Sequence, residues 1–181
     1  MSDKEITRDR LDQLTDDASY LQDEAEALKY VIENVPYDEK PPEGRSIAEI
    51  LLLLDHAQLT YYRPILEDAF KNPRPTNLDQ FEHYSDTFET DRDKPSDIQK
   101  LLSKIAKHRA GLVNAMKQIP LIDWEIVLYR GDKELSLFEF MSEMVQLDRA
   151  KLKEIADRVL VYTQDARARR ELDQRQSQRQ Q

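Results

Sequence analysis

Few residues of this sequence can perform chemistry, because it contains no cysteine and only three histidines, His56, His83 and His108. Without cysteine, the chain has neither a thiolate nucleophile nor a thiolate metal ligand. Imidazole and carboxylate groups together suit Zn, Ni, Mn or Fe. His56 lies in a strongly helical stretch, and with Glu143 or Asp148 from a later helix it would form such a metal site.

Each histidine also has a structural interpretation. A single histidine on a helix carries no ligand spacing, so we favour a partly buried His56 bonded to a neighbouring carboxylate or carbonyl. We expect His108 at the boundary of a buried helix face, without a nearby serine or cysteine nucleophile, and His83 in a solvated loop. The Glu-x-x-His spacing of di-iron bundles does not occur, and three glycines are too few for a phosphate-binding loop.

Aromatic residues offer a second kind of site. Four of them would line a pocket at one end of the fold: Tyr61, Trp124, Tyr129 and Phe138. For Trp124, Tyr129 and Phe138 the alternative, which we favour, is that they cap the hydrophobic core there. Tyr61 is followed directly by Tyr62, so we expect one ring to point inward and the other to lie at a surface or a subunit contact.

Composition excludes several functions. With 36 acidic and 27 basic residues the net charge is -9, which disfavours binding to nucleic acid. No stretch reaches the roughly 18 unbroken apolar residues of a transmembrane helix. The first residues, Met-Ser-Asp-Lys-Glu, lack the apolar core of a signal peptide. We therefore expect a cytoplasmic protein that binds neither nucleic acid nor membranes.

The elements that must position these residues are helices. The most apolar stretch, residues 45–70, repeats hydrophobic side chains at spacings of three and four, as a buried helix does. Three other stretches, 2–35, 96–119 and 136–163, show the same period. All four carry a serine followed three residues later by Glu or Gln, the capping-box pattern: Ser2/Glu5, Ser46/Glu49, Ser96/Gln99 and Ser136/Glu139. The sequence thus predicts an all-α four-helix bundle.

Two proline-containing segments interrupt this pattern. Pro64 lies within the second helix, where it removes one backbone N–H and clashes with the carbonyl of Thr60, so we expect a kink near Thr60 or a break. Residues 71–94 form a long crossover between the second and third helices. We expect one short helix within it, around residues 78–84.

Two further segments depart from the helical period. Residues 121–132 favour extended structure, but no partner strand is evident, so we expect a packed crossover and not a sheet. Residues 164–181 are rich in Gln and Arg and nearly without apolar residues, which indicates a frayed or disordered tail. The chain would then consist of one domain, residues 1–163, and this tail.

The order of these parts resembles the DinB/YfiT-like bundles. The stretch from Arg45 to Leu54 is similar to the family's opening of its second helix, with Arg45 in place of a tryptophan. The stretch from Leu135 to Leu152 is similar to the family's late helix, and together the resemblance covers most of the chain. It implies an up-down-down-up four-helix bundle with a long crossover between helices 2 and 3.

The resemblance also implies a chemistry. Members of this family hold one divalent metal with three histidines, and they include thiol-dependent transferases and isomerases. The corresponding positions in this chain are Leu53, Leu147 and Lys151. Leucine has no lone pair to donate, and a lysine ligand must lose a proton near its pKa of roughly 10.4. The resemblance therefore supports the fold and argues against the activity.

We predict a DinB-like bundle of unassigned activity that lacks the three-histidine metal site and needs no cofactor. It would act as a small-ligand or protein-binding module, with a ligand in the bundle core, and would form a homodimer. The alternative is a divalent-metal-dependent transferase or hydrolase that binds Zn or Ni in a rearranged site around His56. A third interpretation is a helical adaptor whose acidic first helix and tail bind another protein.

Overall fold

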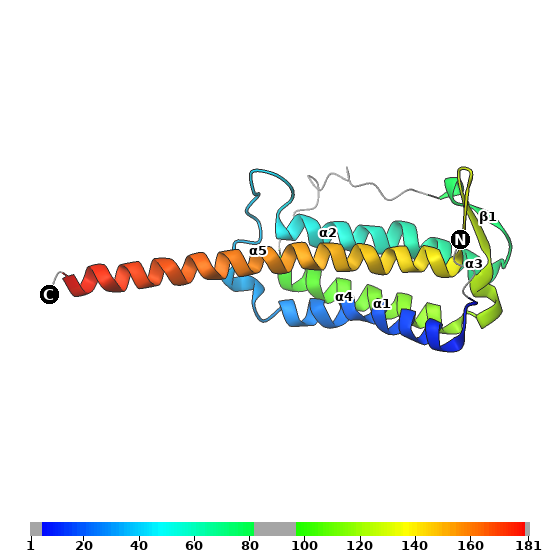
Figure 1. Ribbon diagram of the computed structural model, residues 1–181, viewed down its shortest axis with the longest axis horizontal. Coiled ribbons are helices and arrows are strands. Elements are labelled where there is room, and N and C mark those ends of the chain that lie inside the picture. Colours follow the sequence, from blue (N-terminus) through cyan, green and yellow to red (C-terminus); the bar gives the residue numbers. More distant parts are fainter. Residues whose placement is uncertain (1–4, 82–96, 180–181) are drawn as a thin grey trace.

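The computed structural model describes residues 5–81 and 97–179, which form a four-helix bundle with a small sheet at one end (Figure 1). Helices α1 and α5 run in one direction, while α2 with its continuation α3, and α4, run in the other (Figure 1). This confirms the up-down-down-up order. The main helices are α1 (Arg8–Leu28), α2 (Ile47–Ala57), α3 (Arg63–Lys71), α4 (Ile98–Gln118) and α5 (Leu137–Arg179).

Of the predicted capping boxes within the described residues, the one at α5 is complete, and at α2 the serine cap is present without the return bond from the glutamate. At α5 the exchange is reciprocal: the Glu139 N–H donates to Ser136 Oγ (3.1 Å), and the Ser136 N–H donates to the Glu139 carboxylate (2.7 Å). At α2 the Glu49 N–H donates to Ser46 Oγ (3.1 Å). These bonds satisfy N–H groups that have no partner within the helix.

The other two helices start differently from the prediction. Thr7 caps α1 and Asp97 caps α4, the latter by accepting from the N–H groups of Gln99 and Lys100. The predicted cap residues Ser2 and Ser96 lie outside the described residues. The first helix also ends at Leu28, before the expected residue 35, because the chain tightens into the 3-10 turn η1 (Ile32–Asn34) that buries Ile32.

The irregularity expected near Thr60 is a π-helical turn, η2 (Gln58–Tyr62), between α2 and α3. Such wide turns accommodate an interrupted hydrogen-bond ladder, which Pro64 imposes here. Tyr61 and Tyr62 are both buried, so the expectation that one of them lies at the surface is wrong. Both rings pack on Phe140 of α5, with centroids 5.3 and 5.1 Å away.

The expectation of no sheet is also wrong. Strands β1 (Thr76–Asn77), β2 (Val127–Arg130) and β3 (Lys133–Ser136) form a sheet in that order, with β1 parallel and β3 antiparallel to β2. The missed partner of β2 is the stretch directly after it. The two-residue turn between them starts at Gly131 with φ +61°, a conformation that glycine adopts without strain. Of the short helix expected at 78–84, the 3-10 turn η3 (Leu78–Gln80) is present, and residues 82–84 lie outside the described part.

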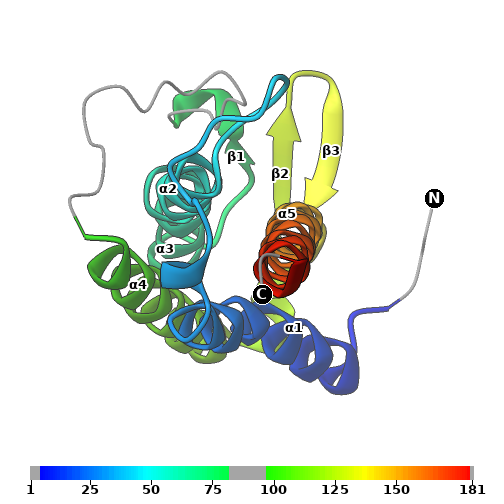
Figure 2. The same ribbon diagram turned by 90° about the vertical axis from the view of Figure 1, so that its left-hand side faces the viewer.

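Helix α5 continues far beyond the bundle, where a frayed or disordered tail was expected (Figure 1). Viewed along the bundle axis, α1, α2, α4 and α5 surround a common core and the end of α5 projects from it (Figure 2). Residues 160–179 extend the helix by about 30 Å. Arg, Gln and Ala are strong helix formers, and Asp165/Arg169 and Glu171/Arg175 have the i,i+4 spacing of supporting charge pairs. The extension therefore remains helical although it is solvated.

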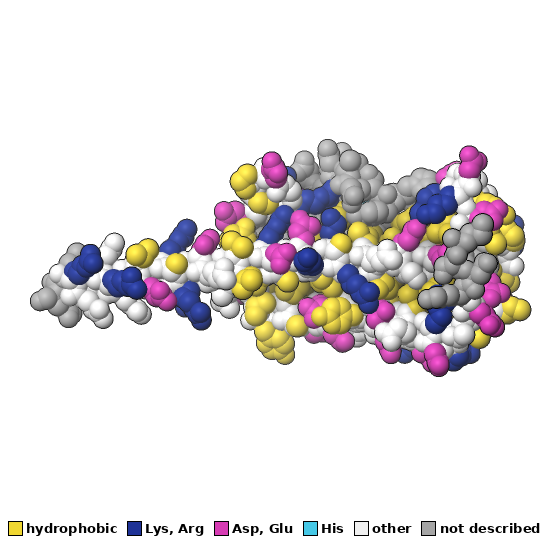
Figure 3. Space-filling model, viewed as in Figure 1, with side chains coloured by type: hydrophobic (Ala, Val, Ile, Leu, Met, Phe, Trp, Pro, Cys, Tyr) yellow, Lys and Arg dark blue, Asp and Glu magenta, His cyan; other side chains and the backbone are white. Residues whose placement is uncertain are grey.

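Along this extension arginine side chains are separated by polar side chains, with few apolar groups at the surface (Figure 3). No helix in residues 5–81 and 97–179 is long and apolar enough to cross a membrane.

Candidate functional site

The positions that correspond to the family's metal ligands lie on α2 and α5. Leu53 is fully buried, Leu147 is partly buried, and the Lys151 ammonium lies 3.6 Å from the carboxylate of Glu154. Two of these side chains have no donor atom and the third carries a positive charge, so the residues present do not fit a divalent cation. Within the described residues, no three His, Asp or Glu side chains are grouped to hold a metal ion.

Next to these positions, the bundle core contains an ion pair between Arg109 of α4 and Asp148 of α5. The exposed fraction of the Arg109 side chain is 0% and that of Asp148 is 5%. Arg109 Nη1 and Nη2 each donate to one carboxylate oxygen of Asp148, the second at 3.1 Å. Burial raises the pKa of the Asp148 carboxyl above its usual value, while the Arg109 guanidinium lowers it.

Arg109 also joins the remaining helices. Its Nη1 donates to the carbonyl of Ala18 in α1 (3.0 Å), and its Nε donates to Gln58 Oε1 in η2 (3.0 Å). Gln58 Nε2 in turn donates to Asp55 Oδ1 (2.8 Å), which lies 2.8 Å from Nδ1 of the partly exposed His108. One hydrogen-bond network thus runs from the surface to Asp148, and it satisfies polar groups that would be costly to bury alone.

The residues of the alternative metal site have separate partners. His56 Nε2 lies 3.3 Å from Thr60 Oγ1. Both carboxylate oxygens of Glu143 accept from Arg130 (2.8 and 3.1 Å), as those of Asp148 accept from Arg109. A metal ion bound by Glu143 and Asp148 would have to displace two guanidinium groups.

Of the four aromatic residues predicted to line a pocket, Phe138 does so. Trp124 is fully buried, and its ring lies edge-to-face with that of Phe138 at 6.5 Å. Tyr61 is buried, and its hydroxyl accepts from Arg130 Nη2 (3.0 Å). Tyr129 is partly exposed in β2, where it pairs with Glu134 of β3. Trp124 therefore caps the core, and Phe138 lies between the core and the surface.

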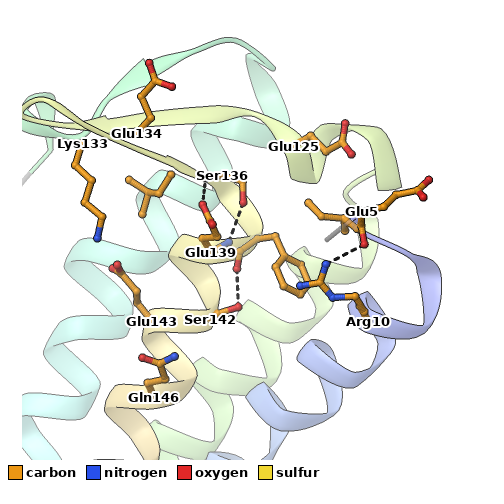
Figure 4. A pocket seen from close by; sticks show the side chains of 13 residues that line it. Glu5, Arg10, Glu125, Lys133, Glu134, Ser136, Glu139, Ser142, Glu143 and Gln146 are labelled. Atoms are coloured by element: carbon orange, nitrogen blue, oxygen red, sulfur yellow. Dashed lines mark hydrogen bonds between the residues drawn. The ribbon is translucent and has the colours of Figure 1, made fainter. Parts of the chain in front are cut away.

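A pocket of about 790 Å³ lies where β3 meets the first turns of α5, facing the start of α1 (Figure 4). A second pocket of about 280 Å³ continues along α1 and α5 and shares Arg10, Phe138, Ser142 and Gln146 with the first. We call the two together the hairpin groove. Its lining on α5 reaches from Phe138 to Arg149, and with Ser136 it spans about 20 Å.

The electrostatics of the hairpin groove are acidic at the hairpin end. Figure 4 shows carboxylates from three different elements around the first pocket, with Arg10 on the α1 side. The Arg10 guanidinium lies over the Phe138 ring, 4.8 Å from its centroid, and its Nη1 donates to the Glu5 carbonyl (2.9 Å). The charges that line the first pocket are those of Arg10 and Lys133 and of the acidic residues Glu5, Glu125, Glu134, Glu139 and Glu143, and the second pocket adds the ion pair of Asp17 and Arg149.

Sequence reasoning missed Arg109, Gln58 and most of the groove lining. A signal for Arg109 exists, because it lies four residues after Ile105 and three before Leu112, on the apolar stripe of its helix. Gln58 has the same signal, because it lies four residues after Leu54 and three before Tyr61, on the inward face predicted for its helix.

These features define the class of fold: the chain has the fold of the DinB/YfiT-like four-helix bundles. YfiT from Bacillus subtilis, described as a probable metal-dependent hydrolase with an unusual four-helix bundle topology, matches this structure with a TM-score of 0.70. The match covers 87% of this chain and 90% of YfiT at 11% sequence identity, and it shows the fold alone. No family model matches the sequence, and the curated proteins contain no match either.

Proposed function

We propose that this protein is a binding module without a metal centre, and that its ligand binds in the hairpin groove. The observation that carries the proposal is the position of the pocket of about 790 Å³, which lies at the hairpin end and is not lined by Leu53, Leu147 or Lys151. The sequence predicted a ligand in the bundle core. We propose instead that the ligand binds at the hairpin end. Homodimer formation stays a prediction.

The core supports this proposal through its charge. In a metal enzyme, ligands with free lone pairs converge on the cation. Here Arg109 donates to both carboxylate oxygens of Asp148, which follows Leu147 directly. The carboxylate nearest in sequence to the family's ligand position is therefore already neutralised by a guanidinium. The hydrolase description belongs to YfiT, and the residues that this chain has at the corresponding positions do not support its transfer.

We expect the purified protein to carry far less than one metal ion per chain, even after growth in medium supplemented with Zn and Ni. His56→Ala should leave the metal content unchanged, because Glu143 and Asp148 are bound by arginines. Elemental analysis of both proteins checks this. One equivalent of metal that disappears in the variant would establish the alternative site around His56.

The binding site itself is tested by NMR mapping of a small-molecule library on the full chain. We expect bound compounds to shift amide signals of β3 and the first turns of α5. Gln146→Trp, which fills the centre of the groove, should abolish these shifts. Lys153→Trp, an exposed site on the same helix outside the groove lining, is the matched control and should retain them. Shifts that centre on Leu53 and Lys151, or no binding by any compound, would refute the proposal.

A further inference from the structure

We propose that the occupant of the hairpin groove is a basic segment of a partner protein, which places an arginine or lysine side chain against Phe138. This inference rests on the proposed function and names the chemistry of its ligand. The protein's own Arg10 demonstrates that chemistry, because its guanidinium already lies over the Phe138 ring at 4.8 Å. A cation over an aromatic face is attracted by the ring's negative π-electron density.

The charges around the ring favour a cationic ligand. Five carboxylates line the larger pocket, against the two cations Arg10 and Lys133. Glu139 is engaged in the α5 cap and Glu143 by Arg130, which leaves the acidic side chains of Glu5, Glu125 and Glu134 as contacts for an incoming cation. Such surface pairs add modest affinity and faster association, and both effects weaken with salt.

The shape of the groove favours a peptide segment over a small organic cation. About 20 Å of groove accommodates about six residues of extended chain. Most of the residues that line the second pocket are polar, but the lining includes the apolar side chains of Leu14, Phe138 and Val145, which would accept an apolar side chain. A small amine would leave this apolar part of the groove unfilled. The length of the groove, its acidic residues and its apolar lining together favour a peptide segment in which basic and apolar residues are interspersed.

Arg10 has a defined role in this inference, since its guanidinium covers the face of Phe138 that the ligand needs. A ligand arginine must displace it or share the ring with it. Arg10→Met removes the competing charge and keeps an unbranched side chain. We therefore expect this variant to bind a basic peptide about three-fold more tightly, the size of a surface cation–π contact.

The probe is a fluorescein-labelled peptide of sequence Arg-Leu-Ser-Arg-Leu-Ser-Arg-Leu, titrated against the full chain by fluorescence polarisation. Replacing its arginines by glutamine should weaken binding at least about ten-fold, and so should Gln146→Trp in the protein. Lys153→Trp should leave the affinity unchanged. Arg10→Met should tighten it, and the same variant should not bind the glutamine peptide more tightly.

Several results would overturn the inference. They are equal binding to the glutamine peptide, binding that survives Gln146→Trp, displacement of the peptide by equimolar spermidine, and no binding at roughly 1 mM. A peptide of residues 164–179 that binds more tightly than the probe would assign the groove to a second copy of this chain. If library compounds map to the groove but no peptide binds, this inference fails while the proposed function stands.

Discussion

Replacing Arg109 by methionine should lower the free energy of unfolding by about 3–5 kcal/mol, because it leaves the Asp148 carboxylate buried without its counter-charge. The change also removes the donors to Gln58 and to the Ala18 carbonyl, so the loss should be near the upper end of that range. Urea denaturation followed by circular dichroism measures the difference.

The double variant Arg109→Met/Asp148→Leu is the informative control. Removing both charges eliminates the unpaired carboxylate, and it should recover most of the lost stability, to within about 2 kcal/mol of the native protein. Methionine is close to arginine in volume, and leucine branches at Cγ as aspartate does, although it is larger. If the double variant is as unstable as Arg109→Met, the ion pair acts through packing and the network, and not through the buried charge.

The second large effect is expected at Phe140, which is fully buried against Tyr61 and Tyr62. Phe140→Ala should lower the free energy of unfolding by about 3–5 kcal/mol, because it removes a buried ring and leaves a cavity beside two other rings. Thermal and urea unfolding measure the change. Hairpin-groove binding by the fraction that remains folded should be retained, since Phe140 does not line the groove.

Phe138 is the matched control, two residues earlier on the same helix and partly exposed. Phe138→Ala should cost about 1 kcal/mol in stability, because less of its surface is buried. It should instead weaken binding of the arginine peptide, since it removes the aromatic face of the groove. Equal stability losses for the two variants would contradict the assignment of Phe140 to the core and Phe138 to the groove.

Periodicity predicted the bundle because apolar spacing and capping residues act locally. The same stripes contain the ion pair: Asp148 lies four residues after Met144 and four before Leu152, as Arg109 continues the stripe of α4. Opposite charges on the buried stripes of two helices indicate a buried ion pair. The pattern alone does not give their pairing, because that depends on the relative register of α4 and α5.

Apolar periodicity and capping residues did not predict the sheet or the hairpin groove, and the reasons differ. Strand β3 reads Lys-Glu-Leu-Ser, which carries little intrinsic preference for a strand and is held there by its pairing with β2. The groove collects polar residues from the chain start, β3 and α5. Each of them, taken alone, is indistinguishable from a residue on an ordinary solvated face.

The chain contains a single tryptophan, and it lies behind the groove. Because the Trp124 ring contacts the Phe138 ring edge-to-face, a ligand that moves Phe138 changes the surroundings of the only indole. Its intrinsic emission is therefore a label-free signal from this one place, without background from any other indole. The molecule carries its own optical probe of occupancy.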